Sequence, residues 1–191
     1  MSRAKTLMAE AFLEEPGAVA TIRKGPEKRL PILKAHFGAE AGAALPQGLS
    51  RCALLDEKVA GIMIVTAPGG KTVFTLDMAR LALQALFSGN LGMLWRGIKS
   101  SFEDNRHRPK EPNYYLEVIA VDPKFQGRGV GGAMLSHLID TADAEGLPIY
   151  VSTTDPKTVP LYRKYGFHTI SETNELKIPN YHMVRKPKAS S

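Results

Sequence analysis

The chain has 191 residues, of which 43% are hydrophobic and 23% are charged, and its formal net charge is +6. This length and composition suit one soluble domain with a sizeable core, so we assign residues 1–191 to a single domain. No stretch is apolar enough to span a membrane, and the N-terminus lacks a secretory hydrophobic region. The sequence therefore predicts a cytoplasmic protein without a membrane partner.

The cysteine count and the distribution of positive charge exclude further classes. A single cysteine excludes an internal disulfide, and Cys52 stands beside Ala53 and Leu54, where we expect a small buried core residue. The lysines and arginines are spread along the chain rather than gathered with aromatic residues in a recognised binding motif. We therefore predict no nucleic-acid partner.

The first half of the chain alternates helical and strand patterns. Residues 2–15 have apolar side chains at helical spacing, and we expect a helix that Pro16-Gly17 ends. Residues 26–44 form a second helical pattern. Residues 51–55 and 59–65 are two apolar runs separated by a short polar turn, which predicts a β-hairpin.

Residues 78–102 are more apolar than a surface loop requires. Their spacing predicts two helices that are split near residues 88–90. Two interpretations stay open: the helices pack in the core, or they form a wall over a substrate site where Trp95 and Phe102 contact the substrate. Residues 103–113 are polar and contain two prolines, and we expect a mobile linker there.

A strand–loop–helix–strand unit follows and organises the rest of the chain. The strand covers residues 115–121, and the helix carries one apolar stripe. This stripe consists of Val130, Met134, Leu135, Leu138, Ile139 and Ala142. Gly146 suits the left-handed residue that ends many helices, and the second strand covers residues 148–153.

The loop between strand and helix has the chemistry of a phosphate site. It reads Gln126-Gly127-Arg128-Gly129-Val130-Gly131-Gly132. A helix start presents unpaired backbone N–H groups at the positive end of the helix dipole, and glycine lets a ligand approach the backbone closely. Lys124 and Arg128 add positive charge, so the loop suits an anionic phosphate ligand.

Three phosphate-binding motifs compete for this loop. A nucleotide-binding P-loop is excluded because Ala133 stands where that motif requires lysine. The glycines also spell the dinucleotide fingerprint G-x-G-x-x-G, with Asp155 near the end of the next strand, and this interpretation stays open as an alternative. A tight packing turn is the remaining structural interpretation.

The third motif is a family resemblance. Gln126-x-x-Gly129-x-Gly131 resembles the Gln/Arg-x-x-Gly-x-Gly/Ala motif of the GNAT acetyltransferase superfamily, and residues 159–167, with Tyr162 and a terminal Gly-Phe, resemble its second signature. More closely, residues 114–186 are similar to the branch that contains puromycin N-acetyltransferase. The resemblance implies an α/β GNAT-like fold: a mixed, largely antiparallel sheet, opened near its middle, with helices on both faces. It also implies an acetyl-CoA-binding core at 114–186 and an acceptor side mainly at 1–113.

Several site residues follow from the resemblance. The loop from Gln126 to Gly132 would cradle the cofactor pyrophosphate, and Tyr162 would protonate the departing thiolate, unless it only packs beneath the helix. The remaining cofactor contacts would come from Ile119, Ala120 and Val121, whose strand holds the pantetheine arm, and from Thr158. Acetyl-CoA and an amine acceptor are the expected partners. No metal is expected, and both monomer and homodimer stay open.

The general base is expected on the central strand. Glu117 is the ionisable residue within the apolar run of that strand, and burial would raise its pKa toward the range that base catalysis requires. The alternative is a structural ion pair with Arg106 or Arg108. These residues together predict an N-acetyltransferase that transfers acetyl to a primary amine of a small molecule.

Two positions depart from the puromycin-type pattern. The chain has residues 152–154 as Ser-Thr-Thr where that branch has Glu-Thr-Ser, and Thr158 where it often has asparagine. The family's usual first edge strand is expected to be absent or very short, because almost nothing precedes the first helix. The acceptor therefore stays open, and so do a protein or peptide acetyltransferase and a non-catalytic acyl-CoA-binding module.

Overall fold

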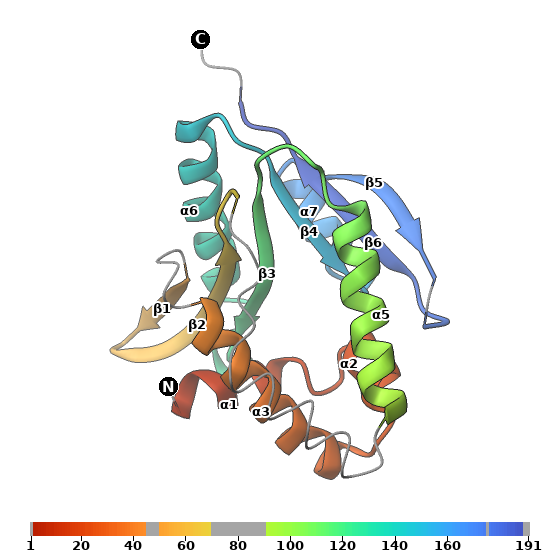
Figure 1. The fold of residues 1–191 in the computed structure, drawn as a ribbon. Helices are drawn as coiled ribbons and strands as arrows, with labels where there is room; N and C mark the ends of the chain where they lie inside the picture. The colour runs from red at the N-terminus through yellow and green to blue at the C-terminus, as the bar shows by residue number, and fades with distance from the viewer. Residues whose placement is uncertain (1, 45–49, 70–90, 175, 189–191) are drawn as a thin grey trace.

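The computed structural model describes residues 2–44, 50–69, 91–174 and 176–188. Six strands of the described residues form one sheet in the order β1-β2-β3-β4-β6-β5 (Figure 1). The strands are β1 (Arg51–Leu55), β2 (Lys58–Thr66), β3 (Tyr114–Val121), β4 (Ile149–Thr153), β5 (His168–Thr173) and β6 (Asn180–Arg185). The helices are α1 (Ser2–Ala11), α2 (Pro16–Ile22), α3 (Pro26–Ala44), α5 (Leu91–His107), α6 (Val130–Glu145) and α7 (Val159–Lys164), with a short 3₁₀ helix η2 at Pro123–Phe125.

The sheet is mixed and mainly antiparallel. Among the strand pairings of the described residues, only β3 and β4 run parallel, and helix α6 makes the crossover that parallel neighbours require. The predicted hairpin is confirmed as β1 and β2, and its turn residues Asp56 and Glu57 have φ angles of 50° and 59°. The predicted α/β fold with a largely antiparallel sheet is therefore confirmed.

Helix α6 covers one face of the sheet. All six apolar residues of the predicted stripe are buried, and they pack with Met63, Leu116, Ile149 and Met183 of the strands. Gly146, at φ 67°, ends the helix, and its N–H donates to the carbonyls of Ala142 and Asp143. The helix limits predicted from the glycines and the apolar spacing are thus confirmed.

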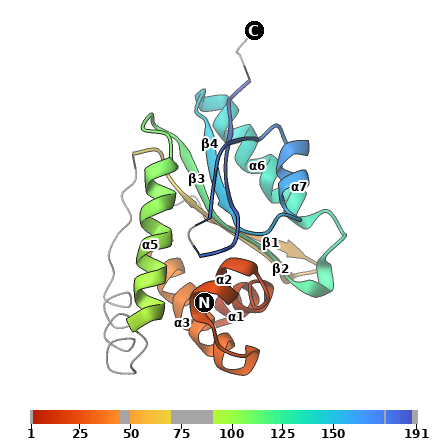
Figure 2. The ribbon, with the colours of Figure 1, turned by 90° about the vertical axis from the view of Figure 1, so that its right-hand side faces the viewer.

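Helices α1 and α3 cover the opposite face. Leu7 and Met8 of α1 and Leu33 and Phe37 of α3 are buried in a second core cluster, which also contains Ile64 of β2. Figure 2 shows these helices across the sheet from α6 and α7. The expectation of helices on both faces is confirmed.

The prediction that Pro16-Gly17 ends the first helix is wrong. Helix α1 stops at Ala11, and Pro16 instead occupies the first turn of α2. Proline suits that turn because the N–H that it lacks has no partner within the helix there. The Glu15 carboxylate caps α2 by accepting a hydrogen bond of 2.8 Å from the Ala18 N–H.

Two further expectations fail. Residues 103–107 belong to α5 rather than to a linker, and Glu103 lies one helical turn from Arg106 and His107, at 3.8 Å from each. Cys52 is exposed rather than buried, because β1 is an edge strand that pairs only with β2. The first helix predicted within residues 78–102 lies outside the described residues.

The described second helix of that segment is not a core helix. Four of its apolar residues recur at helical spacing and are more than half exposed: Leu91, Trp95, Ile98 and Phe102. None of the described residues of α5 is buried. The core interpretation therefore fails for α5, and contact of Trp95 and Phe102 with a substrate stays a prediction.

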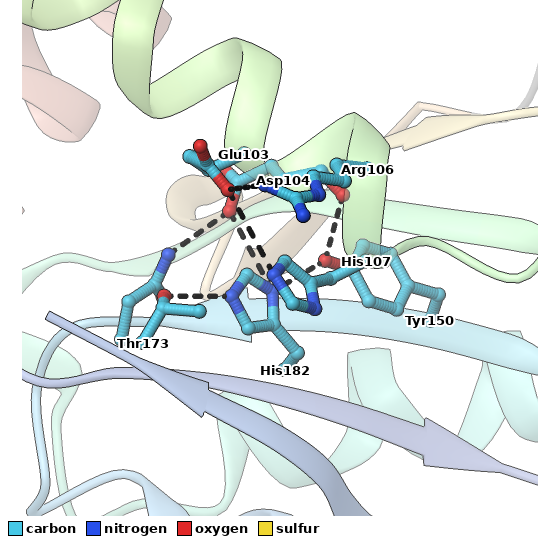
Figure 3. Close-up of polar contacts among 8 residues, drawn as sticks. Glu103, Asp104, Arg106, His107, Tyr150, Thr173 and His182 are labelled. Atoms are coloured by element: carbon cyan, nitrogen blue, oxygen red, sulfur yellow. Dashed lines mark hydrogen bonds and ion pairs between the residues drawn. The ribbon is translucent and has the colours of Figure 1, made fainter. Parts of the chain in front are cut away.

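The C-terminal end of α5 is fixed to the sheet by polar contacts. Figure 3 shows Asp104 and His107 lying against Tyr150 of β4 and His182 of β6. The Tyr150 hydroxyl donates to the Asp104 carbonyl at 3.0 Å and lies 2.8 Å from His182 Nδ1. The His107 ring stacks on the His182 ring with 4.4 Å between centroids. These contacts hold the C-terminal end of α5 beside β4 and β6.

Candidate active site

Strands β3 and β4 separate halfway along β3. Their ladder joins Tyr114 to Ile149 and ends where Leu116 faces Val151, although β3 continues to Val121 (Figure 1). On its other side β3 stays paired with β2 over the same stretch. The backbone edge of Ile119, Ala120 and Val121 that faces β4 is therefore free of the ladder, and the prediction of a sheet opened near its middle is met here.

Glu117 is the extra residue of a β-bulge. In the β2–β3 register, Leu116 lies opposite Val65 and Val118 lies opposite Ile64, so Glu117 has no partner in the ladder. Because of the bulge, the even-numbered residues before and after it lie on opposite faces of the sheet. Leu116 packs in the core under α6, whereas Val118 packs in the core under α1 and α3. Glu117 thus stands at the point where β3 both leaves β4 and changes faces.

The glycine loop has the backbone geometry that a phosphate seat requires. Gly127 and Gly129 have φ angles of 74° and 79°, which residues other than glycine rarely adopt. Helix α6 begins at Val130 without a side-chain cap and without an acidic residue in its first turn. Its N-terminal amide groups and dipole therefore face no competing negative group from that turn.

The side chains beside the loop are mainly positive. Gln126 and Arg128 are exposed, and the Arg128 guanidinium lies 5.5 Å from the Phe125 ring centroid and 4.0 Å from the Asp56 carboxylate. A cavity of about 460 Å³ lies at the segment that leads from β3 into the loop. It is lined by Arg3, Lys58, Val59, Asp122, Lys124 and Phe125. This environment favours an anionic ligand.

Two loop glycines also allow close packing. A Cβ atom on Gly131 would lie 3.4 Å from Val121 Cγ2, and one on Gly132 would lie 2.4 Å from the Tyr165 hydroxyl oxygen. Gly132 therefore brings the start of α6 against the residue that follows α7. Tyr165, the residue after α7, thus packs against Gly132 at the start of α6.

Tyr162 lies on α7 with its ring in the core. Its side chain is buried, its ring meets Phe167 edge-on at 5.4 Å between centroids, and burial raises the pKa of its phenol well above the ordinary value of 10. No group of the described residues forms a hydrogen bond with its hydroxyl. Tyr162 thus packs beneath the helix and also keeps a protonated hydroxyl, so proton donation stays a prediction.

Thr158 joins the start of α7 to the end of β4. Its hydroxyl donates to the Asp155 carbonyl at 2.8 Å and lies 2.8 Å from the Thr153 hydroxyl. Thr158 thus stabilises the turn between β4 and α7. Its contact with a cofactor stays a prediction.

Among the described residues, neither Arg106 nor Arg108 forms a close ion pair with Glu117, although Arg108 lies near enough for the two charges to interact. Arg106 lies near Glu103, and Arg108 donates instead to the Asn113 side chain at 2.8 Å. The Glu117 carboxylate accepts a hydrogen bond from the Thr66 hydroxyl of β2. Because Leu116 packs under α6, the next side chain, Glu117, lies on the α1–α3 side of the sheet.

Sequence reasoning missed Glu40 of α3. Its carboxyl group contacts that of Glu117, and burial first, then the negative charge and hydrogen bond of Glu117, raise the Glu40 pKa to about 8. The available signal was its spacing, because Glu40 follows Leu33 and Phe37 along the buried side of α3. An acid on an apolar helix face marks a site that requires a partner.

The described residues contain neither a cluster of three or more potential metal ligands nor a helix with the length and apolar character of a membrane span. Comparison with known proteins identifies the family of the chain. Residues 37–167 match the family model described as "Acetyltransferase (GNAT) family", and the chain belongs to this family. The matched range contains the glycine loop, Glu117 and Tyr162.

Individual relatives support the fold over different lengths. The chain is 32% identical over 90 residues to the [ribosomal protein bS18]-alanine N-acetyltransferase of Salmonella typhimurium, covering 43% of this chain and 61% of that protein. Three other curated relatives are spanned over only 16%, 34% and 36% of their own length.

Two solved structures resemble nearly the whole chain. The histone acetyltransferase HPA2 and related acetyltransferase from Corynebacterium glutamicum has a TM-score of 0.69 at 20% identity, with 99% of this chain and 92% of that chain covered. Arylalkylamine N-acetyltransferase 2 from Aedes aegypti has a TM-score of 0.66 at 16% identity, with 95% and 93% covered. At these identities the likeness concerns the fold.

Proposed function

We propose that this chain is an acetyl-CoA-dependent N-acetyltransferase that transfers acetyl to a primary amine of a small molecule by direct attack. The observation that carries the proposal is the alignment of three features along β3. The free backbone edge at Ile119–Val121 leads to the glycine loop, and Glu117 stands at the other end of that edge. Membership of the GNAT family supports acetyl-CoA as the donor.

Each part of the site has one task. The loop from Gln126 to Gly132 and the start of α6 bind the pyrophosphate, and the backbone edge of β3 holds the pantetheine arm and polarises the thioester carbonyl. Acetyl-CoA supplies the acetyl group as a thioester. Thr158 contributes to the wall of this slot beside α7.

The proton transfers then fall to Glu117 and Tyr162. A lysine-like amine has a pKa of ~10.4 and is mostly protonated at neutral pH, so Glu117 must remove a proton before or during attack. The new C–N bond forms as the C–S bond breaks. Tyr162, whose phenol is kept protonated by burial, donates a proton to the departing sulfur.

The acceptor class is the finer part of this proposal. The resemblance of residues 114–186 to the puromycin N-acetyltransferase branch favours a small amine, and the likeness to a ribosomal-protein alanine acetyltransferase makes a protein or peptide amine the second candidate. Membership of the puromycin branch and a cytoplasmic location are proposals that rest on the sequence resemblance and composition.

The function is tested with acetyl-CoA and a panel of amines: phenethylamine, spermidine, puromycin and a peptide that begins with alanine. Free thiol release measures turnover. Glu117→Gln should lower turnover by about 10²–10⁴-fold at neutral pH and by less as the pH rises and free amine becomes plentiful. Glu172→Gln, an exposed glutamate on β5, is the matched control.

A melting-temperature measurement separates the competing interpretations. A ligand that binds only the folded state stabilises it, so acetyl-CoA should raise the melting temperature and NADH should not. Stabilisation by NADH alone would support the dinucleotide interpretation. Stabilisation by acetyl-CoA without thiol release on any amine of the panel would support a non-catalytic acyl-CoA-binding module.

A further inference from the structure

Two carboxyl groups from distant parts of the chain meet beside the bulge of β3. Glu40 comes from α3, and its side chain is only 15% exposed. Phe37, one helical turn before Glu40, is buried in the core cluster on the sheet face that α1 and α3 cover. The Glu40 carboxyl group lies within hydrogen-bonding contact of the Glu117 carboxyl group.

Among the described residues, the groups around Glu40 and Glu117 do not offset two negative charges. On α3, His36 Nε2 lies 3.5 Å from Glu40 Oε2, but the His36 side chain is 60% exposed and the two atoms form no hydrogen bond. On α1, Lys5 lies against Gly38. On β2, Thr66 donates to Glu117.

On the Glu117 side, Arg108 is close enough for its charge to interact with the Glu117 carboxylate. Its guanidinium is nevertheless hydrogen-bonded to Asn113. Among the described residues, Arg108 thus offers one positive charge to two potential negative charges.

Two carboxyl groups in contact are stable only when one of them carries a proton. Two ionised carboxylates are both acceptors and repel each other, whereas one protonated partner supplies a donor. Among the described residues, Glu40 Oε2 is a buried oxygen without a hydrogen-bond partner. A proton on the Glu40 carboxyl group would make its contact with the Glu117 carboxylate a donor–acceptor hydrogen bond.

We propose that Glu40 is a positioning residue that retains a proton and donates it as a hydrogen bond to the ionised carboxylate of Glu117. The proposal rests on the proposed function, since it assigns Glu117 as the base. Thr66 and Glu40 then fix Glu117 from two sides, and the pair carries a single negative charge. During acetyl transfer, the amine proton moves to Glu117 and later leaves to solvent, while Glu40 keeps its own proton.

The titration of Glu40 sets the pH limit of this arrangement. Its pKa of about 8 keeps the proton in place at neutral pH. Above that pH the proton leaves, the hydrogen bond to Glu117 is lost, and a second negative charge faces the base. Glutamine at position 40 cannot ionise and still offers an N–H donor, so Glu40→Gln preserves the hydrogen bond at high pH.

The first test reads the proton directly and requires no amine acceptor. Carboxyl ¹³C resonances of the full chain, labelled at glutamate, are followed by NMR from about pH 4 to 10, and the signal of Glu40 is the one that Glu40→Gln removes. Glu40→Asp supplies the assignment if Glu40→Gln does not fold. We expect a midpoint near 8 that moves to lower pH in Glu117→Gln.

Two outcomes of the titration would overturn the inference. A midpoint near the ordinary value of 4.5 would show that Glu40 is ionised at neutral pH. A high midpoint that Glu117→Gln leaves unchanged would show that burial alone, without a shared proton, retains the Glu40 proton. His36→Gln is the matched control, because it removes the other titrating neighbour and should leave a high midpoint in place.

The second test measures whether the proton matters to turnover. The ratio of the wild-type rate to the Glu40→Gln rate is measured against pH with the best amine of the panel, so that the titration of the amine cancels. If the protonated form is required, this ratio should fall by about 30-fold between about pH 7 and about pH 9.5, because that is the loss of protonated Glu40 for a pKa of about 8. Glu40→Ala, which offers no donor, should be slower at every pH.

A flat ratio across this range would remove the positioning role. Failure of every amine to accept acetyl, together with an NMR midpoint near 8 that responds to Glu117→Gln, would count against the proposed function and leave the proton-sharing pair supported. The two failures are therefore distinguishable.

Discussion

The proton assigned to Glu40 has a consequence for stability that can be measured without a substrate. Glu40→Gln removes the ionisable group and keeps a side chain of the same shape that still donates a hydrogen bond. The Glu40 pKa is about 8 in the folded protein against an ordinary value of 4.5. Between these pH values the folded chain binds a proton that the unfolded chain has lost. The stabilisation is fully present below 4.5 and is lost as the pH rises through about 8.

The size of the effect follows from this window. At about 1.36 kcal/mol per pH unit, the interval from 4.5 to about 8 corresponds to at most roughly 4–5 kcal/mol of unfolding free energy. Typical domains have about 5–15 kcal/mol in total, so the change would be a large part of the stability. Glutamine at position 40 lacks this dependence. The variant should therefore gain stability relative to the wild type as the pH rises.

Urea unfolding of both proteins at intervals from about pH 4.5 to 9 measures the difference. The difference in unfolding free energy should change by up to about 1.4 kcal/mol per pH unit within the window and become constant above it. Glu172→Gln, at an exposed position, should show no such slope. A difference between wild type and Glu40→Gln that is independent of pH would refute the reasoning.

Three other predictions test the loop, the proposed acid and the C-terminal strand. Gly129→Asp places a carboxylate and a strained φ of 79° at the start of α6, so affinity for coenzyme A, measured by calorimetry, should fall; unchanged affinity in a folded variant would make the loop a packing turn only. Tyr162→Phe keeps the ring against Phe167 and removes the hydroxyl, so turnover should fall by about 10²–10⁴-fold with little change in melting temperature; full activity would exclude Tyr162 from the mechanism. Arg185 donates two hydrogen bonds of 2.7 and 2.8 Å to the Asp143 carboxylate and thereby lowers the Asp143 pKa. The resulting stabilisation of the fold is present above pH 3.8 and is lost as the pH falls through the lowered pKa. Asp143→Asn should therefore flatten the acid side of the stability–pH curve in urea unfolding, and an unchanged acid side would contradict this.

The features that the sequence predicted correctly depend on local patterns. The apolar stripe of α6 has a 3.6-residue period, Gly146 has the positive φ of a helix end, and the β1–β2 hairpin has a short polar turn. Each of these patterns lies within one continuous stretch of chain, where neighbouring residues determine the backbone. The family motif likewise spans adjacent residues and correctly indicated the fold.

The errors arose where a residue's role depends on tertiary context. Pro16 is compatible both with the end of one helix and with the first turn of the next, and the Glu15 cap that decides between them requires the folded geometry. Cys52 has apolar neighbours in sequence, but its exposure follows from the edge position of β1. Glu40 carries no motif, and its importance emerges only when α3 brings it to Glu117.

The bulge of β3 connects the two sides of the proposed reaction. In a regular strand Glu117 would lie opposite Leu116, and Val118 would return to the α6 face that Leu116 occupies. The extra residue keeps Val118 on the α1–α3 face, the same side on which Glu117 lies beside Thr66 and Glu40. The same region is where β3 leaves β4 and exposes the backbone that leads to the glycine loop. One local irregularity can therefore set the distance between the base and the thioester slot, so changes that remove the bulge should impair both cofactor binding and proton transfer.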